Sequence, residues 1–193
     1  MAFLKLHQVY ALGLKSFGRN VLISDKASFY SPGNIAIGDN VRIDDFCILS
    51  AGKEITLGNY IHIGAYSSLV GKGRIVMEDF SGLAFRCSIY SSNDNYSGDC
   101  LTNPLVPEEF TGVTHADVRL CKYVIVGTGA VILPGVTLNQ GVAIGALSLV
   151  NQDCEEFYIY KGNPARKLMP RSRNLLEVEK KFKNHTNVCQ DIQ

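Results

Sequence analysis

Large hydrophobic residues recur every six positions in the N-terminal half of the chain. Steps of six, six and eight residues form a triplet that repeats, so a longer period of twenty residues contains three of the shorter ones. A period of six fits neither an α-helix nor an alternating strand. It predicts a three-sided coil of short strands, whose large residues point inward and stack from coil to coil. These positions are Phe17, Ile23, Phe29, Ile37, Ile43, Leu49, Leu57, Ile63, Leu69, Met77, Leu83 and Ile89.

Turn-forming residues lie where the period is stretched. The two extra residues of each unit fall within 31–34, 51–54 and 70–73, so they widen the same corner of successive coils. The period of six resumes without interruption from Leu120 to Val150, and glycine often follows the large residue, where it relieves crowding at a corner. A β-sandwich does not predict such constant spacing. The sequence therefore predicts an all-β fold, a left-handed parallel β-helix of hexapeptide repeats.

The interruptions of the repeat divide a single domain, 1–193, into five parts. A long loop between the middle coils is typical of a functional segment. Beyond Pro170, Ser172 can cap a short α-helix from Arg173 to about Lys183, followed by a polar tail. The predicted parts are an N-terminal lead-in (1–16), coils (17–89), an active-site loop (90–119), further coils (120–152) and a C-terminal segment with the helix (153–193).

Charge and composition exclude several classes of function. The formal net charge is +1, which gives no field for nucleic acid or an anionic membrane. No run of eighteen apolar residues predicts a membrane span, and the N-terminus lacks the apolar core of a secretory signal, so we expect a cytoplasmic protein. The six cysteines form no Cys-x-x-Cys pair and have no histidine at ligand spacing, so no metal site is predicted.

The repeat, the long loop, and the segments 131–136 and 161–166 together resemble the hexapeptide-repeat acyltransferases, on the branch of the galactoside, maltose and serine acetyltransferases. The resemblance covers 17–170. It implies a homotrimer with active sites at subunit interfaces and acetyl-CoA as co-substrate. By resemblance, the residues along the coenzyme A path are Gly127, Gly145, Ala146, Lys161, Asn163, Pro164 and Arg166.

Basic residues near the C-terminal end agree with a coenzyme A site. Lys161, Arg166, Lys167 and Arg171 would place cationic donors beside the phosphates of the coenzyme. The alternative is that these side chains only solvate the C-terminal segment.

One residue of the loop departs from the sugar O-acetyltransferases of the family. Where those enzymes have a histidine base early in the loop, this chain has Asp94. A carboxylate suits an ammonium ion, because it can bind the cation and accept its proton. Asp94 is therefore the predicted catalytic residue, and the predicted acceptor is an amino sugar. The predicted substrate-binding residues are Ser92, Asn93, Asn95, Tyr96 and Phe85.

Turn chemistry is the alternative for the run of Asn93, Asp94 and Asn95. The wider loop resembles members of surface-polysaccharide pathways, such as those making lipopolysaccharide O-antigen, and in particular enzymes that acetylate nucleotide-linked 4-amino-4,6-dideoxy sugars. That resemblance implies a nucleotide-sugar substrate such as dTDP-4-amino-4,6-dideoxyglucose. Its base could stack on Tyr96, Phe85 or Phe110.

Three alternatives remain open from the sequence. A sugar or polysaccharide O-acetyltransferase could use His115 or Asp94 as its base. A β-helix scaffold, or a metal enzyme of the carbonic anhydrase kind, would not transfer acyl groups, although only His62 lies within a coil. An acyl-cysteine route would use Cys87, but that residue occupies a small inward position of the repeat, so direct transfer is predicted.

Overall fold

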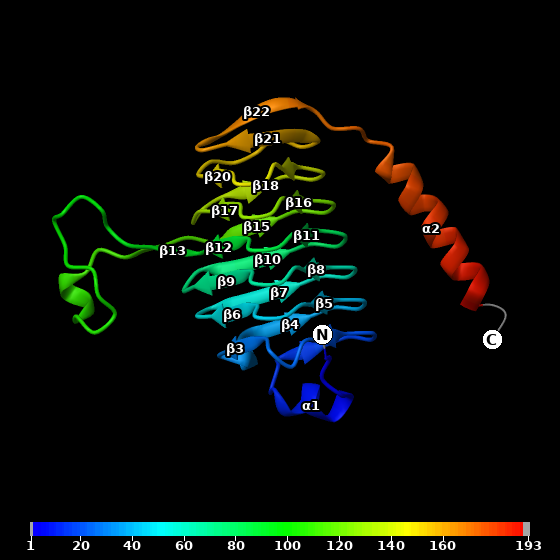
Figure 1. Ribbon diagram of the computed structural model, residues 1–193, viewed down its shortest axis with the longest axis horizontal. Helices are drawn as coiled ribbons and strands as arrows, with labels where there is room; N and C mark the ends of the chain where they lie inside the picture. Colours follow the sequence, from blue (N-terminus) through cyan, green and yellow to red (C-terminus); the bar gives the residue numbers. More distant parts are fainter. Residues whose placement is uncertain (1, 191–193) are drawn as a thin grey trace.

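The computed structural model describes residues 2–190, with the backbone alone for 186–190, and shows a three-sided column of stacked coils (Figure 1). Each coil contributes one strand to each of three sheets, which we call faces A, B and C. Coil-to-coil pairing is parallel, and residues of the predicted ladder face one another: Ile37 pairs with Leu57, and Leu57 with Met77. The parallel β-helix predicted from the period of six is confirmed.

Face A has six strands and face C another six, whereas face B has eight. Face A comprises β1 (Ser16–Phe17), β4 (Ile35–Ile37), β7 (Glu54–Leu57), β10 (Arg74–Met77), β15 (Val118–Leu120) and β18 (Thr137–Leu138). Face B comprises β2 (Leu22–Ile23), β5 (Arg42–Ile43), β8 (His62–Ile63), β11 (Gly82–Leu83), β16 (Ile125–Val126), β19 (Ala143–Ile144), β21 (Tyr158–Gly162) and β22 (Ala165–Pro170). Face C comprises β3 (Ser28–Tyr30), β6 (Ile48–Ala51), β9 (Ser68–Gly71), β12 (Ser88–Tyr90), β17 (Val131–Ile132) and β20 (Leu149–Val150).

The core is the stack of inward side chains inside the column. Ile23, Ile43, Ile63 and Leu83 form one such ladder on face B, and each is at most 2% exposed. Fully burying one such side chain is worth about 1.5–3 kcal/mol. A single coil leaves its ladder residue open above and below, so this stabilisation requires the neighbouring coils.

Polar side chains accept hydrogen bonds from backbone amides where the chain turns from face A to face B. The amide of Asp39 donates to Asn59 Oδ1 at 2.8 Å, and that of Asn59 donates to Asp79 Oδ1 at 2.7 Å. The glycine before this position has little room, because a Cβ on Gly38 would lie 2.5 Å from the carbonyl oxygen of Gly58. Glycine therefore relieves a close approach of backbones between coils, as expected.

The long loop interrupts the column between faces C and A. β12 ends at Tyr90 and β15 begins at Val118, so the insertion occupies 91–117, slightly less than predicted. It leaves from the corner that is widened in earlier coils, where η1 (Pro32–Asn34) lies. β13 (Ser92–Asn93) and β14 (Thr114–His115) pair antiparallel, and η2 (Glu108–Phe110) lies beyond them. We call this projection the arm (Figure 1).

Helices lie at the two ends of the chain. α1 (Leu6–Ala11) covers the first coil, and α2 (Leu175–Gln190) runs beside the column from its C-terminal end (Figure 1). The predicted end of the helix at Lys183 is wrong, since 184–190 contain neither Pro nor Gly to stop it. The predicted polar tail is thus helical to Gln190, and its last three residues lie outside the described residues.

Candidate functional site

The corner between faces B and C, which we call edge BC, brings together the small residues predicted for coenzyme A. A Cβ on Gly127 would lie 2.6 Å from the amide nitrogen of Ala146, and a Cβ on Gly145 would lie 3.0 Å from Lys161 Cβ. The four residues are thus neighbours in three successive coils. The glycines allow the coils to approach closely here, and the exposed side chain of Leu147 projects beside Ala146 and over Gly129.

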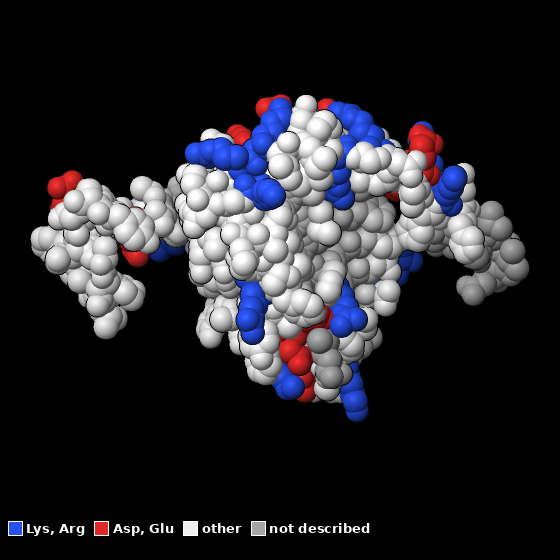
Figure 2. Space-filling view, turned by 45° about the horizontal axis from the view of Figure 1, so that its top comes forward, with Lys and Arg blue, Asp and Glu red and all other residues white. Residues whose placement is uncertain are grey.

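A hairpin completes the C-terminal end of edge BC. β21 and β22 pair so that Lys161 faces Arg166, and the cis Asn163–Pro164 bond lies in their turn. Ser148 holds the hairpin on the last coil, since its hydroxyl donates to the carbonyl of Gly145 at 2.7 Å and accepts from the amide of Gly162 at 3.1 Å. Lys and Arg side chains gather over this end of the column (Figure 2).

Two of the predicted basic residues have structural partners instead of free donors. Arg171 is part-buried and donates to the carbonyls of Tyr123 and Gly141 at 2.9 and 3.0 Å. Its burial lowers the pKa of the guanidinium. Lys167 pairs with Glu155 at 2.6 Å and lies over the ring of Tyr158. Lys161 has no carboxylate partner among the described side chains, and Arg166 donates to the carbonyl of Ala165 at 3.2 Å.

The base of the arm is fixed by Ser92. Its hydroxyl accepts from the amide of Lys72 at 2.7 Å and shares a hydrogen bond of 2.8 Å with His115 Nδ1. Ser92 therefore anchors the arm to the coil beneath it. His115 returns beside the start of the arm, as the sequence allowed.

Asp94 and His115 line one cavity of about 510 Å³ within the arm. Lys72 and Glu108 lie at its rim, with 3.6 Å between Nζ and Oε1, and the rest of the wall includes Asn103, Pro104, Val106, Thr111 and Val113. A carboxylate and an imidazole in one cavity can bind a cationic amine and accept its proton.

The neighbours of Asp94 have different surroundings. The Oδ1 atom of Asn95 accepts from the amide of Ser97 at 2.8 Å, which is the turn chemistry kept open above. Tyr96 is 85% exposed on the arm. The carbonyl of Asn93 accepts from the hydroxyl of Thr114 at 3.3 Å, so its backbone belongs to the β13–β14 pairing.

One chain does not bring the two halves of the predicted site together. Phe85 and the coenzyme A residues lie along edge BC, whereas Asp94 lies on the arm, which leaves the corner between faces C and A. The six steps from Phe85 to Ser91 cross face C between these corners, a span of at most roughly 20 Å at about 3.3 Å per residue. Phe85 is thus separated from the other predicted substrate residues within the chain.

The sequence analysis missed an aromatic and cationic ladder on edge BC. The rings of Phe46 and Tyr66 stack with centroids 4.9 Å apart, and the Arg86 guanidinium lies 5.8 Å from the centre of Tyr66. The twenty-residue period, applied to exposed positions instead of inward ones, would have found these three residues.

Cys87 and His62 occupy the places expected for residues outside the site. Cys87 is fully buried, and burial raises the pKa of its thiol, which makes it a poor nucleophile. His62 points outward from face B, and its Nε2 lies 2.8 Å from the buried Asp44 carboxylate. Within the described residues no group of His, Cys, Asp or Glu side chains is arranged to hold a metal ion.

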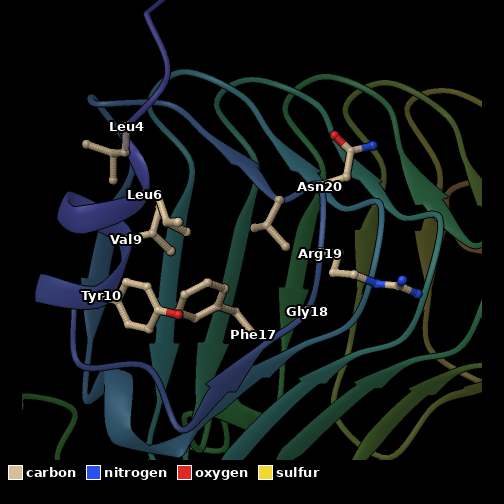
Figure 3. Close-up of a pocket in the computed structure, with 9 residues that line it drawn as sticks. Leu4, Leu6, Val9, Tyr10, Phe17, Gly18, Arg19 and Asn20 are labelled. Carbon is tan, nitrogen blue, oxygen red and sulfur yellow. The ribbon is translucent and has the colours of Figure 1, made fainter.

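A second cavity, of about 540 Å³, lies under the first coil and has no reactive group (Figure 3). Leu4, Leu6 and Tyr10 form one wall, and the charged residue beside it, Arg19, is paired with Asp39 at 3.0 Å.

Across the described part of the chain, no helix combines the length and apolar character needed to span a membrane.

Comparison with known proteins gives full-length relatives. The chain is 51% identical over 184 residues to a dTDP-4-amino-4,6-dideoxy-D-glucose acyltransferase of Escherichia coli, which covers 95% of this chain and 96% of the relative. The chain belongs to the hexapeptide-repeat acyltransferases. No family model matches it.

Solved structures of AntD, an N-acyltransferase from Bacillus cereus, match this acyltransferase over nearly their whole length. A variant of AntD in complex with dTDP-4-amino-4,6-dideoxyglucose and coenzyme A is 43% identical, with a TM-score of 0.93 and coverage of 95% and 98%. AntD in complex with dTDP and 3-hydroxybutyryl-CoA is also 43% identical, with a TM-score of 0.93. A hexapeptide-repeat acetyltransferase from Vibrio cholerae, 20% identical with a TM-score of 0.56, shares the fold alone.

Proposed function

We propose that this protein transfers the acetyl group of acetyl-CoA to the amino group of a nucleotide-linked amino-deoxy sugar, such as dTDP-4-amino-4,6-dideoxyglucose. The observation that carries the proposal is the 51% identity, over nearly the whole chain, to an acyltransferase of that sugar. Two further features support it. The arm has Asp94 where a hydroxyl acceptor would favour a histidine, and edge BC offers a path of small residues ending at Lys161 and Arg166.

The chemistry is direct transfer in a ternary complex. Asp94 binds the ammonium group of the sugar and accepts its proton, and the neutral amine then attacks the thioester carbonyl. A backbone N–H of edge BC stabilises the oxyanion, and coenzyme A leaves as a thiolate that takes up a proton. Cys87 takes no part, because its sulfur is inside the column.

The active site is formed between two copies of the chain in a homotrimer. Support comes from the separation of Asp94 from edge BC across face C, since a ring of three copies can place the arm of one beside edge BC of the next. A head-to-tail interface of this kind closes when the rotation is one third of a turn. We place the enzyme in the cytoplasm, in the synthesis of lipopolysaccharide O-antigen or a related surface polysaccharide.

Turnover of purified protein tests the proposal. Acetyl-CoA is supplied with dTDP-4-amino-4,6-dideoxyglucose or with dTDP-glucose, and free thiol is measured together with the mass of the sugar nucleotide. We expect acetylation of the amino sugar alone. Turnover of only the hydroxy sugar would instead favour an O-acetyltransferase that uses His115. Failure to bind acetyl-CoA would favour a scaffold.

Replacement of Asp94 tests its role within that reaction. Asp94→Asn should lower kcat by about 100-fold or more, because the amide cannot accept a proton. The affinity for acetyl-CoA should stay within about twofold of the wild-type value. The matched control is Asp99→Asn on the same arm, whose carboxylate only accepts from the hydroxyl of Ser97 at 2.7 Å. An unchanged rate for Asp94→Asn would remove this residue from the site.

The length of the acyl group is tested in the same assay. AntD has been solved with 3-hydroxybutyryl-CoA, so this donor is compared with acetyl-CoA at equal concentrations. A higher kcat/KM for acetyl-CoA is expected, and the reverse result would change the proposed donor without changing the acceptor.

A further inference from the structure

A cavity of about 300 Å³ lies on face B, where α2 begins beside the corner between faces A and B. Its floor is Gly82, which pairs with His62 of the preceding coil and Ile125 of the next. A Cβ on Gly82 would meet only the carbonyl oxygen of His62, at 3.5 Å, so the outward position of β11 is open. Leu175 of α2 and the ring of Tyr60 complete the wall. The cavity thus arises from one missing side chain between two outward ones.

Arg171 lines the same cavity and has a charge that no carboxylate balances. Its Nη1 atom donates to the carbonyls of Tyr123, Gly141 and Val142 at 2.9, 3.0 and 3.3 Å, which fixes the guanidinium against the corner. Among the described residues, no Asp or Glu forms an ion pair with it, and no carboxylate opposes the lowering of its pKa by burial. Carbonyl dipoles hold this cation in place, but they do not neutralise it.

Charged groups that flank the cavity are paired with one another. Lys122 pairs with Glu179 at 2.7 Å. The buried carboxylate of Asp44 accepts from Arg42 Nε at 2.7 Å, and its other oxygen lies 2.8 Å from His62 Nε2. The imidazole ring is therefore fixed as part of the wall, and the positive charge available to a ligand comes from the guanidinium.

We propose that this cavity binds a small apolar carboxylate, such as an aromatic acid, with the carboxylate on Arg171 and the ring over Gly82. A guanidinium whose Nη1 is engaged still has Nε and Nη2, which together can bind both oxygens of a carboxylate. The ring packs against Ile125 and Leu175, and the anion supplies the counter-charge that a part-buried cation requires. A volume of about 300 Å³ is at the lower end for small-molecule sites, so the ligand is much smaller than a coenzyme.

The cavity is separate from the acyl-transfer site, so this inference does not rest on the proposed function. The corner between faces A and B lies opposite face C, whereas the arm and edge BC occupy the two corners that flank face C. Copies that meet through the arm and edge BC leave the cavity on the outside of the assembly.

Equilibrium dialysis of the full-length protein with radiolabelled benzoate tests the site. Arg171→Gln should weaken benzoate binding by about tenfold or more, because it removes the charged donor. Arg171→Lys should recover part of that loss, since it restores the charge without the planar fork. Gly82→Leu should also weaken binding by about tenfold or more, because its side chain occupies the cavity.

Two matched variants control for these changes. Arg173→Gln removes an exposed arginine of the same segment, which pairs with Glu156 at 2.8 Å. Gly33→Leu adds the same side chain at a glycine where a Cβ would meet nothing within 4 Å. Both should bind benzoate within about twofold of the wild-type affinity. Arg171→Gln also loses bonds to backbone carbonyls, so its fold is checked by circular dichroism, and Gly82→Leu tests the site with the guanidinium in place.

Competitors define the class of ligand. Unlabelled benzoate should displace the label, whereas benzamide, inorganic phosphate and coenzyme A should each be weaker by about tenfold or more. Equal displacement by benzamide would show that the charge is not recognised, and equal displacement by phosphate would show the same of the apolar body. Displacement by coenzyme A would assign the cavity to the coenzyme. Each of these results would overturn the proposal, as would absence of benzoate binding or equal affinity in Arg171→Gln and Gly82→Leu.

Discussion

Two edges of the column contain aromatic ladders built in the same way, yet one is covered and the other is open. At the corner between faces A and B, edge AB, the rings of Tyr60 and Phe80 stack with centroids 4.7 Å apart, and Tyr123 follows at 5.8 Å. These residues have left-handed φ values like Phe46 and Tyr66 on edge BC. Tyr123 is only 7% exposed, whereas Tyr66 is 57% exposed.

The difference comes from α2. Phe182 meets the rings of Tyr60 and Phe80 edge-on, at 5.3 and 6.2 Å. Glu179 accepts from Lys122 at 2.7 Å and from the hydroxyl of Tyr123. The backbone therefore presents aromatic residues at both corners, and a helix distant in the sequence covers part of one set: Tyr123 is buried, whereas Tyr60 is still 37% exposed. On edge BC the ring of Tyr66 contacts Phe46 and Arg86 and its rim faces solvent.

Replacing one aromatic residue on each edge by alanine should give the largest difference in the free energy of unfolding between the two edges. Phe80→Ala should lower the free energy of unfolding by about 3 kcal/mol, because it leaves a gap beneath α2. Tyr66→Ala should lower it by less than about 1 kcal/mol, since its ring is largely in water. The urea midpoint is measured at one protein concentration, because assembly shifts the apparent stability. Equal losses would contradict the distinction between covered and open edges.

Glu179→Gln should remove the stabilisation that the ionised carboxylate gives to edge AB. Burial alone would raise the pKa of Glu179, but hydrogen bonds from Lys122, Tyr123 and Lys183 outweigh it and lower the pKa from 4.5 to about 2. A lowered pKa in the folded state stabilises the protein above the unfolded value and loses that effect as the pH falls. The variant should be less stable by about 2 kcal/mol at pH 7.

The pH dependence supplies the check on that carboxylate. The difference in unfolding free energy between wild type and Glu179→Gln should shrink as the pH is lowered from 4.5 towards 2, the interval between the unfolded and folded pKa values. Glu177→Gln, on the exposed side of α2 and paired only with Lys180, is the control. A difference that did not change with pH would assign the loss to packing instead of charge.

Removal of a single tyrosine hydroxyl group on each edge should give the smallest difference in stability between the two edges. Tyr123→Phe should lower the stability by about 1 kcal/mol, because Glu179 loses a hydrogen bond. Tyr66→Phe should change the stability by less than about 0.5 kcal/mol, because its ring is largely in water and keeps its contacts with Phe46 and Arg86. Equal losses in the two variants, measured as urea midpoints, would contradict the distinction between the two edges.

Much of the candidate site could be placed from the sequence because the coil repeats. A residue at a given position of a coil stacks on its equivalent in the next coil, so the inward ladder could be read from the sequence, whereas Gly127, Gly145 and Lys161 were named from the family resemblance and the structure shows them to be neighbours. The same regularity gave the inward position of Cys87. The conformation of the arm has no such repeat, so the turn at Asn95 could be given only as an alternative, and the contact of Ser92 with His115 was not predicted.

The sequence by itself determined the column, its three faces and the corner from which the arm projects, because a strict period leaves one arrangement that buries every large residue. Tertiary structure decided which exposed residues remain available. Lys167 and Arg171 look like ligands for phosphate in the sequence but have partners in Glu155 and in buried carbonyl groups. Such pairings join segments with no common period, so only the folded chain reveals them.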